Sequence, residues 1–133
     1  MTQPWHRFPD VQAALVVLLE GLAGGPAHTG IETPEDLLAA TPFIRVRRIG
    51  GTSDHLHDWA TVEVDVFHTT YRGGEERAER VRELLTGTKL RVGPMVLDNV
   101  ICQVSPTELP WGPGIRRFGA TYRVVSRRYR ATG

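Results

Sequence analysis

Residues 11–23 carry apolar side chains at the spacing of an α-helix. The preceding Phe8-Pro9-Asp10 segment is typical of a helix start, and Gly24 follows the last periodic position. Val16 and Val17 lie beside the main stripe, so the predicted helix is apolar over more than one face. A second apolar face indicates either contact with another subunit or deep burial under a sheet. The stripe itself consists of Val11, Ala14, Leu15, Leu18, Leu19 and Leu22.

A second amphipathic helix is predicted over residues 75–86, after Arg72-Gly73-Gly74 interrupts the preceding strand. This helix is highly charged and has only a narrow apolar stripe, so we expect it to cover one side of a sheet. A short third helix is predicted to begin at the cap signal Thr33-Pro34 and to continue through Ala40.

Valine alternates with polar residues over residues 61–66, which predicts a strand with one face on a core and the other toward water or a partner. The Gly- and Pro-containing segments 50–58 and 106–115 are predicted to be loops. Residues 1–133 are therefore predicted to form a single α+β domain, in the order helix, two strands, helix, then two or three strands. We expect a mainly antiparallel or mixed sheet of about four to five strands, flanked by two helices. The other predicted strands are 43–49, 89–92, 96–104 and 117–128.

The composition is that of a soluble globular protein with one core: 133 residues, 41% apolar and 23% charged. Its apolar segments fall short of the roughly 20 residues needed to cross a bilayer, and residues 1–10 lack the pattern of a signal peptide. We therefore expect no membrane contact. Cys102 is the one cysteine, which suits a reducing cytoplasm, and its apolar strand context predicts burial.

The net charge is only +1, but its distribution is uneven. No acidic residue follows Glu108, so the end of the chain is a local cationic segment. Such a segment could track phosphates, which leaves a small DNA-binding module as one alternative. However, aromatic residues that could stack on bases do not alternate with these arginines. The arginines concerned are Arg116, Arg117, Arg123, Arg127, Arg128 and Arg130.

Two predicted strands carry opposite charges. Arg45 and Arg47 share one face of the first strand, and Glu63 and Asp65 share one face of the second. Complementary faces on neighbouring copies could pair head to tail, and such contacts close into rings when the rotation allows. We favour this pairing over contact with DNA. The predicted subunit-interface residues are Val16, Val17, Arg45, Arg47, Glu63, Asp65, Arg123 and Arg127.

Catalytic chemistry has weak support in the sequence. Asp54, His55, His57 and Asp58 are the best candidates for a metal or acid–base site. On an extended chain His55 and His57 project to opposite sides, and no distant third ligand completes a recognisable set. We therefore predict no catalytic residues, no metal and no cofactor, and we do not expect an enzyme.

Several short strings resemble tail terminator proteins of long-tailed (siphovirus-type) actinobacteriophages, and together they span nearly the whole chain. The closing run from Leu109-Pro110-Trp111 through Arg116 to Tyr122 is the most specific of them. The others are Phe8-Pro9-Asp10-Val11, Pro42-Phe43-Ile44-Arg45-Val46 with Ile49-Gly50-Gly51-Thr52, and Val62-Glu63-Val64-Asp65-Val66-Phe67 with the charged helix that ends in Leu84-Leu85.

The resemblance implies a structural virion protein that forms a homo-hexameric ring. Such a ring terminates tail-tube polymerisation and joins the tail to the head connector, while genomic DNA passes through its lumen without sequence-specific binding. It implies assembly in the host cytoplasm and a final place at the head–tail joint. Another connector protein, of the stopper or head-completion kind, remains an alternative. The predicted partner-contact residues are Asp54, His55, His57, Asp58 and Trp111.

Overall fold

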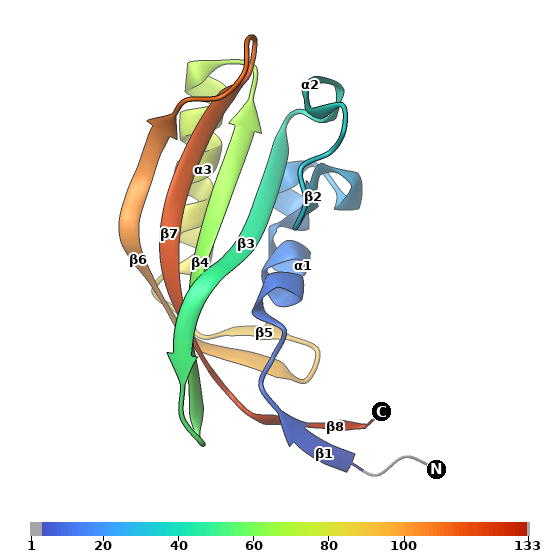
Figure 1. The fold of residues 1–133 in the computed structure, drawn as a ribbon, viewed down its shortest axis with the longest axis vertical. Helices are drawn as coiled ribbons and strands as arrows, with labels where there is room; N and C mark the ends of the chain where they lie inside the picture. The colour runs from blue at the N-terminus through green and yellow to red at the C-terminus, as the bar shows by residue number, and fades with distance from the viewer. Residues whose placement is uncertain (1–3, 133) are drawn as a thin grey trace.

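The computed structural model describes residues 4–132, in which a six-stranded sheet is covered on one face by two helices (Figure 1). The helices are α1 (Val11–Ala23), α2 (Leu37–Ala40) and α3 (Tyr71–Leu85), with a 3-10 turn at Pro26–His28. The strands are β1 (Pro4–Arg7), β2 (Thr29–Gly30), β3 (Phe43–Ser53), β4 (His57–His68), β5 (Leu90–Val92), β6 (Met95–Leu109), β7 (Arg116–Arg127) and β8 (Tyr129–Thr132).

The main sheet has the strand order β2-β3-β4-β7-β6-β5. Only the short β2–β3 pair is parallel, and the other neighbours are antiparallel. Strands β1 and β8 form a separate two-stranded antiparallel ribbon, which lies at one end of the molecule (Figure 1). The α+β class is thus confirmed, but the sheet has more strands than predicted, and β1, β2 and β8 were missed.

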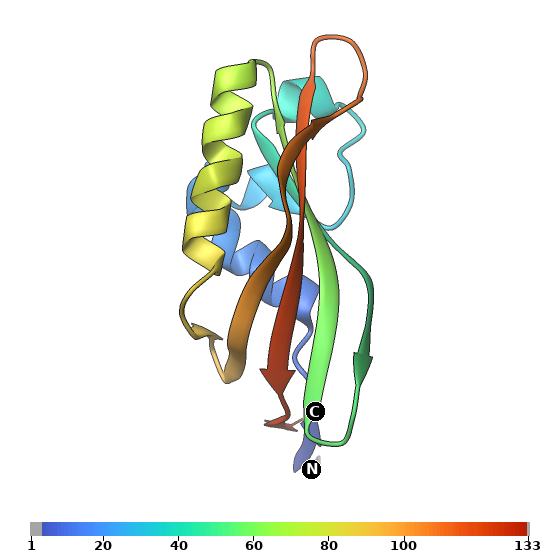
Figure 2. The ribbon, with the colours of Figure 1, turned by 90° about the vertical axis from the view of Figure 1, so that its left-hand side faces the viewer.

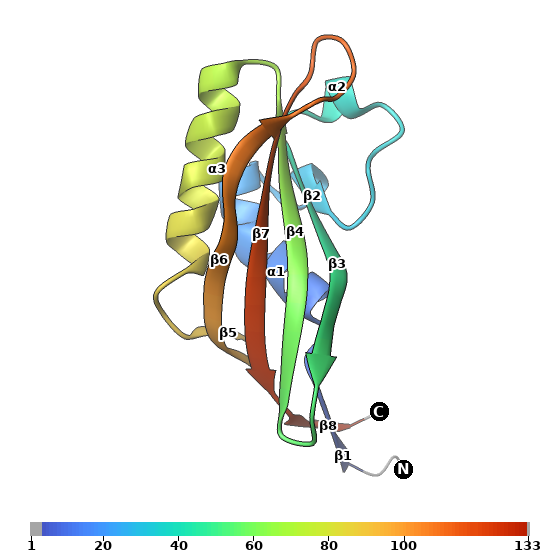
Figure 3. The ribbon, with the colours of Figure 1, turned by 60° about the vertical axis from the view of Figure 1, so that its left-hand side comes forward.

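Helices α1 and α3 lie side by side on one face of the sheet, and most of the opposite face carries no helix (Figures 2 and 3). The core between them contains the valines of β4 and alternate residues of β7, as their period of two predicts. Tyr122 and Leu15 are among its largest fully buried side chains. Cys102 is only half-buried and packs at the margin of this core, so it is less buried than predicted.

A smaller apolar cluster lies at one end of the opposite face. Leu37 of α2 packs there with Phe43 and Phe67, against Ile115 from the loop between β6 and β7. Helix α2 is shorter than predicted because Asp36, and not Thr33, caps it by accepting the Ala39 amide.

The segment 50–58 is mostly strand, which corrects the predicted loop. Strand β3 continues to Ser53, β4 begins at His57, and only three residues form the turn between them. A register shift between Arg48 and Gly50 keeps the pair together past the glycines. Gly51 has a φ of 130°, and a Cβ there would lie 2.3 Å from the Trp59 carbonyl oxygen, so the strand requires glycine at this point.

Helix α3 also begins earlier than predicted, at Tyr71, because Thr70 caps it by accepting the Gly73 amide. The glycines that suggested a break lie in its first turn. A Cβ on Gly74 would lie 2.7 Å from the Phe118 ring, so these glycines let the helix approach the sheet closely. The predicted loop 106–115 is likewise shorter, because β6 continues to Leu109.

Candidate functional site

The predicted complementary charges meet within one chain. Arg45 lies opposite Asp65 in the β3–β4 register, and its Nη2 donates to Asp65 Oδ2 at 2.7 Å. Arg47 lies opposite Glu63 and donates to Glu63 Oε1 at 2.6 Å. Arg117 on β7 contacts both acids, at 3.0 Å to Asp65 and 3.2 Å to Glu63. These four predicted interface residues therefore pair with each other inside the chain, and not between copies as predicted.

Of the two acids in this cluster, Asp65 is more deeply buried than Glu63. The Asp65 side chain has no exposed surface, and this burial raises the pKa of its carboxyl even though hydrogen bonds from Arg45 and Arg117 act in the opposite direction. Gly119 makes room for it, because a Cβ there would lie 2.8 Å from Asp65 Oδ1. Trp111 covers the cluster, with the Arg45 and Arg117 guanidiniums 5.5 and 5.4 Å from its ring centre. A closed cluster of this kind fixes the β6–β7 loop onto the sheet.

Among the predicted partner-contact residues of the β3–β4 hairpin, the two aspartates are engaged within the chain, whereas His55 is exposed. Asp58 is buried in β4 and forms a two-pronged ion pair with Arg48, at 2.6 and 2.9 Å, so it is not available to a partner. Asp54 accepts the Leu56 and His57 amides, and these hydrogen bonds lower the pKa of its carboxyl. His55 is exposed at the hairpin tip, beside Leu56, whose side chain is 65% exposed.

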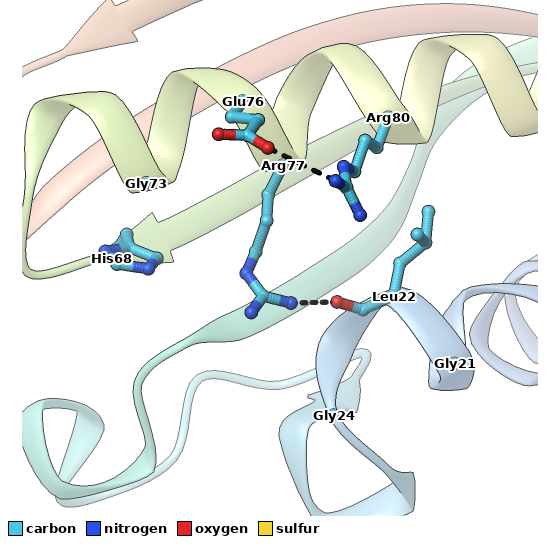
Figure 4. Close-up of a pocket in the computed structure, with 8 residues that line it drawn as sticks. All are labelled: Gly21, Leu22, Gly24, His68, Gly73, Glu76, Arg77 and Arg80. Atoms are coloured by element: carbon cyan, nitrogen blue, oxygen red, sulfur yellow. Dashed lines mark hydrogen bonds and ion pairs between the residues drawn. The ribbon is translucent and has the colours of Figure 1, made fainter.

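A cleft of about 430 Å³ lies between the end of α1 and the first turns of α3 (Figure 4). Arg77 donates across it to the Leu22 carbonyl and so satisfies the end of α1, while Arg80 pairs with Glu76 on its own helix. Desolvation and the charge of Arg77 lower the pKa of His68. Both arginines are thus engaged with the protein itself, and nothing in the cleft pairs a nucleophile with a base.

Metal-binding and membrane-spanning features are missing from the part of the chain that the structure describes. Among residues 4–132, no group of three or more His, Cys, Asp or Glu side chains could hold a metal ion. No helix in that range is long and apolar enough to cross a bilayer.

Among the surfaces that expose apolar side chains, two lie on opposite layers of the molecule. The first, which we call the α1 face, consists of Ala13, Val17, Glu20 and Gly21 on the outer side of α1. Val17 is 51% exposed, whereas Val16, also predicted to be at an interface, packs partly against the core.

The second surface lies on the face of the sheet away from α1 and α3, and we call it the β6–β7 face. Ile101 is 47% exposed and Val104 is 52% exposed. Ile101 lies opposite Arg123 and Val104 opposite Thr121 in the β6–β7 register, so all four share one face with Val125. Arg123 was predicted from the sequence to lie at an interface, whereas Ile101 and Val104 were not. Arg127 instead pairs with Asp98 at 2.9 Å.

Similarity to known proteins is found at the level of the fold. No protein-family model matches the sequence, and no curated protein sequence matches it. Seven chains of solved structures do match. One is a chain in the structure of the virion of a native gene transfer agent particle, with a TM-score of 0.64 over 88% of this chain and 94% of that chain. The two sequences are 16% identical, so the similarity shows a common fold.

Proposed function

We propose that this chain is a structural virion protein, and specifically a tail terminator that forms a homo-hexameric ring at the head–tail joint. The observation that carries the proposal is the fold similarity to a chain of a gene transfer agent virion, which extends over 88% of this chain and 94% of that one. A match over nearly the full length of both chains favours a similar kind of building block. The sequence resemblance to tail terminators points the same way.

The uncovered surfaces support assembly. The α1 face and the β6–β7 face both expose apolar side chains, and they lie on opposite layers of the chain (Figure 2). Two different uncovered surfaces on one subunit are what a head-to-tail ring requires, because each copy contacts two neighbours through unlike surfaces. The proposed role is structural and not enzymatic, in keeping with a cleft whose arginines are already engaged.

The shape of the subunit supports two further partners. The β3–β4 turn and the β6–β7 loop with Trp111 lie at opposite ends of the long axis (Figure 1). Leu56 and Trp111 are exposed at these ends, 65% and 42% respectively. A subunit with apolar contacts at both ends can join the tail tube on one side and the head connector on the other, with DNA passing through the ring.

The test is the mass of the purified protein in solution, alone and after mixing with the tail-tube protein of the same virion. We expect a ring of about six copies, formed either spontaneously or on the tube. A strict monomer in both conditions would overturn the proposal. Immunogold labelling of virions then separates the two connector roles: label at the last ring of the tube indicates a terminator, and label on the head side of the joint indicates a stopper.

A further inference from the structure

The α1 face and the β6–β7 face are chemically complementary. Each combines exposed apolar side chains with a single charge, and the two charges are opposite. Val17 and Glu20 provide these features on α1, while Ile101, Val104 and Arg123 provide them on the sheet. Glu20 is the only charged residue of α1, so a partner that covers this helix meets an apolar surface with one carboxylate.

Neither Glu20 nor Arg123 has an ion-pair partner among residues 4–132. Arg127, four positions along the same strand, pairs with Asp98. Arg117, on the same face of that strand, pairs with Glu63 and Asp65. Arg123 therefore presents an unpaired charge beside Ile101, on a strand face whose other two arginines are neutralised.

The two faces cannot meet within one chain, because α1 covers one side of the sheet and the β6–β7 face lies on the other (Figures 2 and 3). A contact between them joins two copies, and it leaves one face of each copy free for the next. Contacts of this unlike kind propagate in one direction and close into a ring when the rotation per copy divides a full turn.

We infer that the α1 face of one copy packs on the β6–β7 face of the next, with Glu20 paired to Arg123 and Val17 set between Ile101 and Val104. This inference rests on the ring-forming function proposed above and names the surfaces that build the ring. Apolar contact drives the association, and the charge pair fixes register and direction, because a shift of one copy along the contact separates the two opposite charges.

Charge reversal tests the pairing. Glu20→Arg and Arg123→Glu each place like charges across the contact, so each variant alone should raise the apparent dissociation constant of the ring by about tenfold or more. Mixing the two variants should restore assembly in alternating copies, because each variant then meets an opposite charge on both sides. The double variant should assemble by itself. Mass in solution, with tail-tube protein where the ring needs it, measures all four samples.

Matched controls use charges that also have no ion pair but lie outside both faces. Glu32→Arg and Arg91→Glu make the same charge changes at an exposed loop residue and at the one exposed residue of β5, and both should assemble like the wild type. Circular dichroism verifies that each variant is folded.

The remaining outcomes distinguish a failure of the Glu20–Arg123 pairing from a failure of ring formation itself. Single variants that assemble like the wild type overturn the inference but leave the ring in place. Single variants that fail and are rescued neither by mixing nor by the double substitution also overturn the pairing. A wild-type chain that stays monomeric with and without tube protein overturns the proposed function together with the inference.

Discussion

At the scale of single residues, the buried ion cluster under Trp111 is the most consequential feature. Asp65 lost its whole hydration shell when the sheet formed, and two guanidiniums replace that shell. A buried charge with partners is tolerated, but removing one partner leaves the others uncompensated in a region of low dielectric. The cluster also connects β3, β4 and β7 with the loop that carries Trp111, so its loss affects more than one strand.

We predict that Asp65→Ala destabilises the fold by about 3 kcal/mol, at the lower end for a buried pair because Glu63 still faces Arg45 and Arg117. Urea unfolding followed by tryptophan fluorescence measures the change. The control is Glu108→Ala, which removes an exposed pair with Arg116 and should cost about 1 kcal/mol or less. Equal costs for the two variants would show that the Asp65 cluster contributes no more than a surface ion pair.

At the scale of elements, glycine has two different roles in the two long helices. Gly74 lies against Phe118, where an added Cβ would be 2.7 Å from the ring. Gly21 lies on the outer face of α1, where an added Cβ would have no neighbour within 4 Å. Packing therefore requires glycine at position 74 in α3 but not at position 21 in α1.

Gly74→Ala should therefore destabilise the protein by about 1 to 3 kcal/mol, because overpacking against Phe118 outweighs the better helix propensity of alanine. Gly21→Ala is the matched control and should stabilise it by about 0.5 to 1 kcal/mol. Thermal unfolding of both variants supplies the comparison. A stabilised Gly74→Ala protein would mean that α3 can move away from the sheet at little cost.

The helices and strands could be predicted from the sequence except where a glycine serves close packing. The start and end of α1 and the core faces of β4 and β7 followed from periodicity, because these segments bury one face and expose the other. The β3–β4 hairpin and the start of α3 did not, since local glycine content suggests a turn. At Gly51 and Gly74 the glycine instead serves a close approach that only tertiary structure reveals.

The residues of the exposed surfaces could be predicted from the sequence only in part. The sequence identified Val17 and Arg123 as candidate interface residues. It could not show that Arg45 and Arg47 are satisfied by Glu63 and Asp65, because strand register decides which charges face each other. The three register shifts along β6 similarly hid the exposure of Ile101 and Val104 on the uncovered face.

At the scale of the whole molecule, the charge distribution bears on the DNA-binding alternative. The C-terminal arginines look like a cationic patch in the sequence, but the fold brings carboxylates to several of them. Arginines that are already paired gain little from a phosphate, since they lose one ion pair to form another. The basic residues with carboxylate partners are Arg45, Arg47, Arg48, Arg80, Arg82, Lys89, Arg116, Arg117 and Arg127.

We therefore predict that mixed-sequence duplex DNA binds this protein with a dissociation constant above about 100 µM at 0.15 M salt, at the weak end of non-specific binding. Fluorescence anisotropy of a labelled duplex measures it across a salt series. Glu108→Gln frees Arg116 and removes one negative charge, so it should strengthen binding at low salt if carboxylate pairing is what suppresses it. Micromolar binding by the wild type with a steep salt dependence would contradict this prediction. A ring with weak affinity of this kind would let DNA slide through its lumen without holding it.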